Sequence, residues 1–161
     1  MTDEAKQSIG KALGKVPSGV YILTVTHAGE SSALLVSWVQ QAAFAPPSLT
    51  IAMARERPAR RLIDAGGAFA ISVLAKGDTN LMKKYARGIP DGENPFAGIT
   101  TGTTPGGAIY LADALAWLEC RRLTSCDFGG DHDIYIAEIT AGQLLKDEPS
   151  FTHTRGNGFH Y

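Results

Sequence analysis

The feature that most constrains the fold is a series of short β-branched and apolar runs separated by turn residues. The runs are residues 19–27, 31–39, 48–54, 68–75, 114–123 and 133–145, and residues 151–156 add a short last one. The first run is apolar on both parities, which is typical of a strand covered on both faces. Six or seven strands with only short helices favour a mainly β fold, a closed or nearly closed antiparallel barrel, over a doubly wound sheet.

Turn and helix signals punctuate these runs. The tripeptide AGE at 28–30 is typical of a hairpin turn, and the apolar spacing in residues 3–14 predicts a short amphipathic helix. Pro58 suits the first position of a helix that ends before Gly66, and Asp78 suits the N-cap of a helix that ends before Gly88.

Residues 88–109 form the longest stretch without a regular pattern, with six Gly and three Pro among 22 residues. A loop of this length in a small domain is more often functional, or ordered by a partner, than a free linker. We therefore expect a lid or a subunit contact there. No internal repeat or composition shift divides the chain, so residues 1–161 are expected to form a single domain.

Composition narrows the class of partner. Charged residues make up 19% of the chain, hydrophobic residues 44%, and the formal net charge is −1, which favours neither disorder nor a surface for nucleic acid. No apolar run approaches the 18 residues or so that span a bilayer, and the start, MTDEAKQSIGKALGKV, lacks a signal-peptide core. We expect no membrane partner and a cytoplasmic location.

The cysteines and histidines give no metal signature. Cys120 and Cys126 are separated by five residues, which matches neither a zinc knuckle nor a redox Cys-x-x-Cys, so we expect buried or idle thiols. No paired metal-ligand spacing occurs among His27, His132, His153 and His160. The terminal pair His160 and Tyr161 is expected either to fray or to cap a pocket.

Residues 129–139, GGDHDIYIAEI, place a histidine between two aspartates where a turn leads into a strand. His132 shares its parity with Ile134 and Ile136, so we expect it on an apolar strand face, at the first exposed rung. Turn positions collect Gly, Asp and His for local reasons. The histidine is therefore structural in one interpretation and faces a ligand in the other.

The stretch VSWVQQAAFAPPSLTIAM at 36–53 contains a Pro-Pro pair that predicts an extended segment outside the β ladder. Its free backbone N–H groups, with the Ser37 hydroxyl and the amides of Gln40 and Gln41, could hydrogen-bond the edge of a flat heteroaromatic ring in an apolar slot. The alternative is a plain β-arch with a Pro-Pro corner.

The next run, ARERPARRLI at 54–63, places Arg55, Arg57, Arg60 and Arg61 around the expected helix start. Cations near a helix N-terminus oppose the helix dipole, and a bound phosphate would relieve the conflict. The alternative is a set of solvated surface arginines. No Gly-x-Gly-x-x-Gly or P-loop is present, so neither a Rossmann nor a Walker mode of binding is supported.

Seven stretches together resemble, in order, the flavin reductase-like family of FMN-binding split barrels. They are GVYILT (19–24), SWVQQAAFAPPSLTIAM (37–53), FAISVLA (69–75), NPFAG (94–98), ALAWLECR (114–121), GDHDIYIAEI (130–139) and the closing RGNGFHY. The resemblance covers roughly residues 10–161. The SWVQQAAF variant is similar to the flavin reductase-like module of multidomain flavodiiron proteins.

The resemblance implies a six-stranded split barrel that forms a homodimer and binds FMN, with FAD as a second option. NADH or NADPH would reduce the flavin, and reduced flavin or electrons would pass to a monooxygenase or another acceptor. The residues implied at the isoalloxazine edge are Ser37, Trp38, Val39, Gln40, Gln41 and Ala42. Those implied near the flavin phosphate are Arg55, Arg57 and Arg60, and His132 would lie at the flavin face where nicotinamide stacks.

The chain departs from the family pattern before Pro46. Gln40, Gln41, Ala42 and Ala43 stand where Ser and Thr are usual, so more of the binding would come from backbone donors and arginines. Two other functions stay open: an FMN-binding electron carrier with little direct NAD(P)H activity, and a non-catalytic split barrel that binds another heterocycle. Fold alone does not choose among them.

Overall fold

The computed structural model describes residues 1–90 and 92–159, which form a mainly β fold, as expected. The helices are α1 Asp3–Leu13, α2 Pro58–Asp64 and α3 Thr79–Ala86. The strands are β1 Ser18–Gly19, β2 Tyr21–His27, β3 Glu30–Val36, β4 Val39–Phe44, β5 Pro47–Ala54, β6 Ala68–Val73, β7 Thr101–Thr103, β8 Ile109–Leu111, β9 Ala116–Cys126, β10 His132–Leu144 and β11 Thr152–His153.

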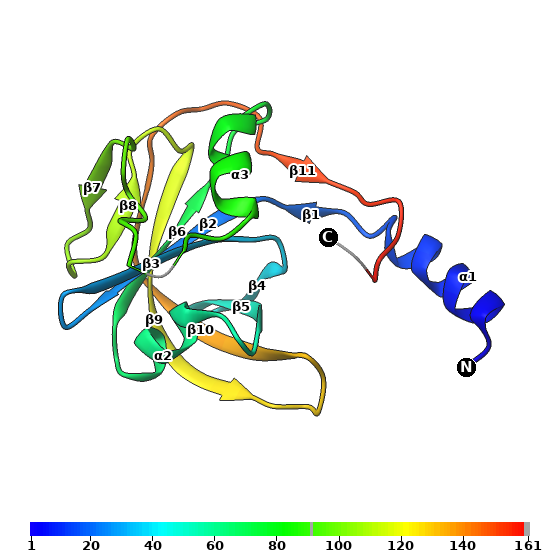
Figure 1. The fold of residues 1–161 in the computed structure, drawn as a ribbon. Helices are drawn as coiled ribbons and strands as arrows, with labels where there is room; N and C mark the ends of the chain where they lie inside the picture. The colour runs from blue at the N-terminus through cyan, green and yellow to red at the C-terminus, as the bar shows by residue number, and fades with distance from the viewer. Residues whose placement is uncertain (91, 160–161) are drawn as a thin grey trace.

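The main sheet is antiparallel and curls on itself (Figure 1), in the strand order β3-β2-β6-β9-β10-β5-β4. It has seven strands where six were expected. The additional strand is β4, which pairs with β5 through partners such as Gln40 with Thr50 and Phe44 with Pro47. The expectation that this segment lies outside the ladder is therefore wrong, because Pro47 is tolerated as the first residue of its strand.

The predicted helices are confirmed. Thr2 caps α1, α2 has Pro58 at its start, and Asp78 is the N-cap residue of α3. Gly66 and Gly88 follow α2 and α3 with φ of 92° and 75°. The AGE hairpin is confirmed too, with left-handed φ values at residues 28 and 29 that suit the tight turn between β2 and β3.

Strand ends differ from the expected ones by a few residues. The run 31–39 ends as a strand at Val36, and residues 37 and 38 form the crossing into β4. The run 19–27 is interrupted at Val20, which separates β1 from β2. In Figure 1 the β9–β10 hairpin extends beyond the curled sheet, and α1 lies apart from it beside the β1–β11 pair.

Both faces of the sheet are buried around β2 and β6. Leu23, Ile51 and Phe69 belong to the core cluster inside the curl, which α2 closes with Leu62 and Ile63. A second cluster joins the other face of the sheet to α3. Its main side chains are Val20, Ile22, Leu74, Leu81, Tyr85 and Leu111. The prediction that residues 19–27 are covered on both faces is confirmed.

Residues 88–109 are more regular than expected, because β7 and the first residue of β8 lie within them and pair as a hairpin. Ile89, Phe96 and Ile99 pack against the second cluster. The Tyr85 hydroxyl of α3 donates to the Pro95 carbonyl at 3.0 Å. Packing on α3 thus orders the segment, and its role as a lid or subunit contact stays a prediction.

The thiols do not form a site in the described residues. Cys120 is buried, and burial raises its pKa to about 12, while Cys126 is exposed at the end of β9. Among residues 1–90 and 92–159, no three metal-ligating side chains of His, Cys, Asp or Glu come together. None of the helices in the described part of the chain combines the length and apolarity needed to cross a membrane.

Candidate active site

Trp38 lies at the crossing from β3 to β4, where the chain changes direction. Its carbonyl accepts a hydrogen bond of 2.9 Å from the Ala52 N–H of β5, which fixes the crossing against the sheet. Its ring centroid is 4.8 Å from that of His132, with the planes tilted by 50°, and the Arg155 guanidinium carbon is 5.2 Å from its centroid. Trp38 therefore joins residues from three distant parts of the chain.

Three adjoining cavities meet at Trp38 and Arg155. The first, called the apolar slot below, has a volume of about 280 Å³. Its walls come from the end of β3, from β5 and from α3, and they include Val36, Met53, Met82 and Tyr85. The polar groups at the slot are Ser37, Arg57, His153 and Arg155. Mostly apolar walls with few polar groups are typical of a site for a flat organic ligand.

The predicted arginines separate into two groups. Arg57, the N-cap residue of the seven-residue helix α2, lines the apolar slot and has no ion pair within the described residues. Arg55 and Arg60 instead bond to protein carboxylates, Asp127 and Asp133 respectively. The anion that the run of four arginines predicts is therefore supplied by the chain itself for Arg55 and Arg60, and also for Arg61, which pairs with Glu30.

Asp133 sits between Arg55 and Arg60, and these three residues are called the carboxylate clamp below. Asp133 Oδ2 bonds to Arg60, while Oδ1 lies 3.2 Å from Arg55 Nη2. Arg60 Nε also donates to the buried Tyr135 hydroxyl at 3.1 Å. That hydrogen bond, with nearby carboxylates, raises the pKa of Arg60 against the lowering effect of burial, so the Arg60 guanidinium stays charged.

His132 opens β10, opposite Ala54 of β5, and its residue is only 7% exposed. The expectation of an exposed rung is wrong, because Trp38 and the C-terminal segment cover the ring. Nδ1 lies 2.8 Å from Asp131 Oδ1, and a carboxylate only accepts, so Nδ1 carries the hydrogen. This hydrogen bond lowers the pKa of Asp131. In the neutral ring Nε2 is then a hydrogen-bond acceptor.

The imidazole lines the second cavity, of about 370 Å³, together with Trp38, Arg155 and Phe159. This cavity, called the histidine pocket below, adjoins the apolar slot across Trp38. Trp38 and the oriented His132 thus border the histidine pocket, while Arg57 and apolar side chains border the apolar slot. The arrangement suits two planar ligands that must meet near Trp38.

Comparisons with known proteins agree with this architecture. The family model described as "Flavin reductase like domain" matches residues 13–158. This chain belongs to the flavin reductase-like domain family. Diflavin flavoprotein A 1 of Synechocystis is 37% identical over 153 residues, which are 94% of this chain and 26% of that protein. The chain thus spans about a quarter of the length of this curated relative, and the resemblance to flavodiiron-type proteins is confirmed.

Two solved structures share the fold. The NADH:FAD oxidoreductase of Streptomyces globisporus C-1027 superposes with a TM-score of 0.84 at 24% identity, covering 96% of this chain and 91% of that one. The flavin reductase HpaC, complexed with NADP⁺, gives a TM-score of 0.75 at 21% identity, covering 95% and 94%. These flavin reductase folds confirm the predicted fold class.

The other predicted residues of this flavin reductase-like domain lie along β4. Val39 and Gln40 line the third cavity, of about 600 Å³, with Ser37 and Trp38. Gln41 and Ala42 are exposed and line none of the cavities around Trp38. Because β4 is an edge strand of the main sheet, one side of its backbone pairs with no other strand of the described residues.

Arg155 is the residue of this family member that sequence reasoning missed. Its segment packs on α1, where Arg155 N–H donates to the Gly14 carbonyl at 2.8 Å and Gly158 N–H donates to the Gly10 carbonyl at 2.7 Å. A Cβ on Gly14 would lie 2.4 Å from the Arg155 carbonyl oxygen. The sequence signal for this contact is the pair Gly10 and Gly14, which lie four residues apart and so on one side of α1, where another segment can approach closely. His160 and Tyr161 lie outside the described residues.

Removing the clamp carboxylate should destabilise the domain. In the variant Asp133→Ala, the Arg55 and Arg60 guanidiniums lose their shared partner, and we expect a loss of about 2–3 kcal/mol in the free energy of unfolding. Urea unfolding monitored by circular dichroism measures it. The control Glu30→Gln breaks the exposed pair with Arg61 and should cost at most about 1 kcal/mol. Equal losses in the two variants would contradict a special role for the clamp.

Proposed function

We propose that this chain is an NAD(P)H-dependent flavin reductase that holds FMN, or the same half of FAD, in the apolar slot. The observation that carries the proposal is the slot itself: apolar walls, a cation without an ion pair among the described residues, and an oriented histidine across Trp38. Family membership supports it. A bound flavin would supply the redox chemistry by accepting a hydride from the nicotinamide.

Arg57 is assigned to the flavin phosphate. Its guanidinium presents several N–H donors in a planar fork that matches phosphate oxygens. Arg55 and Arg60 are assigned a supporting part, since the clamp holds the turn that carries Arg57. Of the three arginines that the resemblance implies at the phosphate, one would therefore bind it and the other two would support the turn.

The crossing residues are assigned to the ring. Ser37 contributes a hydroxyl and Trp38 an aromatic wall to the slot, while Val39 and Gln40 line the adjoining third cavity and are assigned to the part of the ring that reaches it. Hydrogen-bond donors at the ring edge stabilise the negative charge that develops when a flavin is reduced. Gln41 and Ala42, farther along β4, are left with a supporting part in this assignment.

His132 is assigned to orientation of the nicotinamide. Its Nδ1 bonds to Asp131, which fixes the plane of the imidazole beside Trp38, so the ring can orient a planar carboxamide by contact with its face or edge. The histidine pocket places that ring next to Trp38 and therefore next to the slot. No proton transfer by the protein is required, because the hydride passes between the two cofactors.

Reduced flavin or its electrons would go to an oxygenase or another acceptor, and the chain would act as a homodimer. The longer curated relative supports the first part, since a domain of this kind makes up only a quarter of it. The second part rests on the family resemblance.

The decisive test is an anaerobic absorbance titration of the protein reconstituted with FMN, adding NADH and then NADPH. We expect loss of the oxidised-flavin band far faster than for free FMN with the same nucleotide, and the faster donor identifies the preferred one. Tight FMN binding without bleaching would favour an electron carrier. Absence of FMN binding would contradict the proposal in every form.

The variant His132→Ala should act on the nicotinamide alone. Loss of this ring contact predicts an increase of about two- to tenfold in KM for the nicotinamide, or an equal slowing of reduction, with FMN affinity nearly unchanged. Stopped-flow reduction and flavin fluorescence titration measure the two effects. Unchanged reduction kinetics would return His132 to a structural role.

The variant Arg57→Ala should distinguish flavins by their phosphate. We expect FMN affinity to fall by roughly 10- to 100-fold, from the loss of charge-assisted hydrogen bonds, while riboflavin affinity changes little. Arg61→Ala is the matched control, since Arg61 is an exposed arginine of the same helix that pairs with Glu30. If FMN and riboflavin weaken equally, Arg57 does not hold the phosphate.

A further inference from the structure

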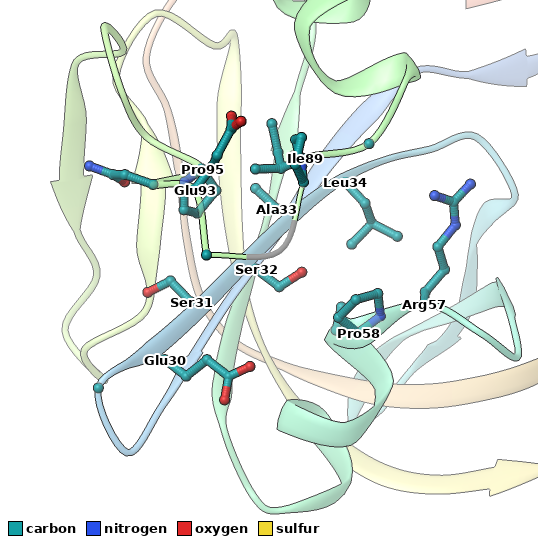
Figure 2. A pocket seen from close by; sticks show the side chains of 16 residues that line it. Glu30, Ser31, Ser32, Ala33, Leu34, Arg57, Pro58, Ile89, Glu93 and Pro95 are labelled. Carbon is teal, nitrogen blue, oxygen red and sulfur yellow. The ribbon is translucent and has the colours of Figure 1, made fainter.

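A fourth cavity adjoins the slot at Arg57. It has a volume of about 420 Å³ and is called the β3 chamber here. Figure 2 shows Ser32 and Leu34 of β3 opposite Pro58 of α2, with Ile89 and Pro95 of the loop after α3 above them in the view. Its volume falls in the range of about 300–1,000 Å³ that is usual for small-molecule sites.

The β3 chamber and the apolar slot share two lining residues, Arg57 and Leu34. A ligand whose phosphate sits on Arg57 therefore borders both cavities. We propose that the β3 chamber takes the adenosine half of FAD, so that the chain prefers FAD to FMN. This inference rests on the proposed function, because it needs the flavin half of the molecule in the slot.

The walls suit a nucleobase. Leu34, Pro58, Ile89 and Pro95 supply apolar surfaces for a flat ring. Strand β3 is an end strand of the sheet, and apart from its ladder with β2 no backbone hydrogen bond joins residues 31–35 to another described segment. Adenine carries adjacent donor and acceptor groups, and the N–H and C=O groups of a strand edge present the same alternation.

The charges suit a nucleoside rather than a second anion. Besides Arg57, the charged residues among the described lining are Glu30 and Glu93. Glu30 bonds to Arg61, whereas Glu93 is exposed and has no ion pair within the described residues. Carboxylates repel a phosphate but accept hydrogen bonds from ribose hydroxyls. Arg57, the one cation in the described lining, borders both cavities, so the pyrophosphate of FAD would lie beside it.

The chamber fits the adenosine half of the flavin better than that of the nicotinamide nucleotide. His132 and Trp38 line the space assigned to the nicotinamide, and neither of them lines the β3 chamber. A hydride donor must also arrive and leave in each cycle. A molecule that fills both cavities at Arg57 makes contacts in each of them, which suits the flavin better than the exchanging hydride donor.

The test compares dissociation constants of FAD, FMN and riboflavin by fluorescence titration, for the wild type and for Ser32→Phe, which fills the chamber. We expect FAD to bind the wild type at least about tenfold more tightly than FMN, and the ratio to fall toward one in Ser32→Phe. The control Ser125→Phe makes the same change on exposed strand β9 and should keep the wild-type ratio.

A second measurement uses only the wild-type protein and therefore does not require that Ser32→Phe folds. AMP alone, added to the wild type, should displace FAD and should not displace riboflavin, which does not enter the chamber. Equal affinity for FAD and FMN, or displacement of riboflavin by AMP, would overturn the inference while leaving the reductase proposal intact. Failure of all three flavins to bind would instead overturn the proposed function.

Discussion

The arrangement of the site depends on the carboxylate clamp of Asp133 between Arg55 and Arg60. Successive side chains of a strand point to opposite faces, so the clamp that holds Asp133 toward α2 leaves the neighbouring His132 pointed toward Trp38. The same clamp fixes the turn between β5 and α2, which carries Arg57. One buried carboxylate and its two partly exposed guanidinium partners thus set the positions of the imidazole and of the cation that faces the slot.

Two other constraints complete the site from outside the barrel. The crossing at Ser37 and Trp38 is held by the Ala52 hydrogen bond, which places an aromatic ring between the slot and the histidine pocket. The C-terminal segment then brings Arg155 against that ring, because Gly10 and Gly14 let the segment approach α1 closely. Backbone hydrogen bonds, from Ala52 to Trp38 and from Arg155 to Gly14, hold both segments, so the side chains that face the cavities have rigid supports.

Local signals in the sequence were sufficient for the elements whose causes are local. Pro58, Asp78 and the glycines after α2 and α3 predicted the helix ends, because capping and proline geometry involve only near neighbours. The alternating and two-sided apolar runs predicted the strands for the same reason. The pairing of β4 was not predicted, since Gln40 meets Thr50 only after the chain has turned through the two prolines.

By itself, then, the sequence determined the mainly β class, the short helices, the family and the set of candidate residues. Tertiary structure decided which of those residues face a ligand: it paired Arg55 and Arg60 with carboxylates more than 70 residues away, left Arg57 at the slot, buried His132 and brought in Arg155. The physical reason is that charge neutralisation and burial depend on partners distant in the chain. No local pattern records which carboxylate will meet which guanidinium.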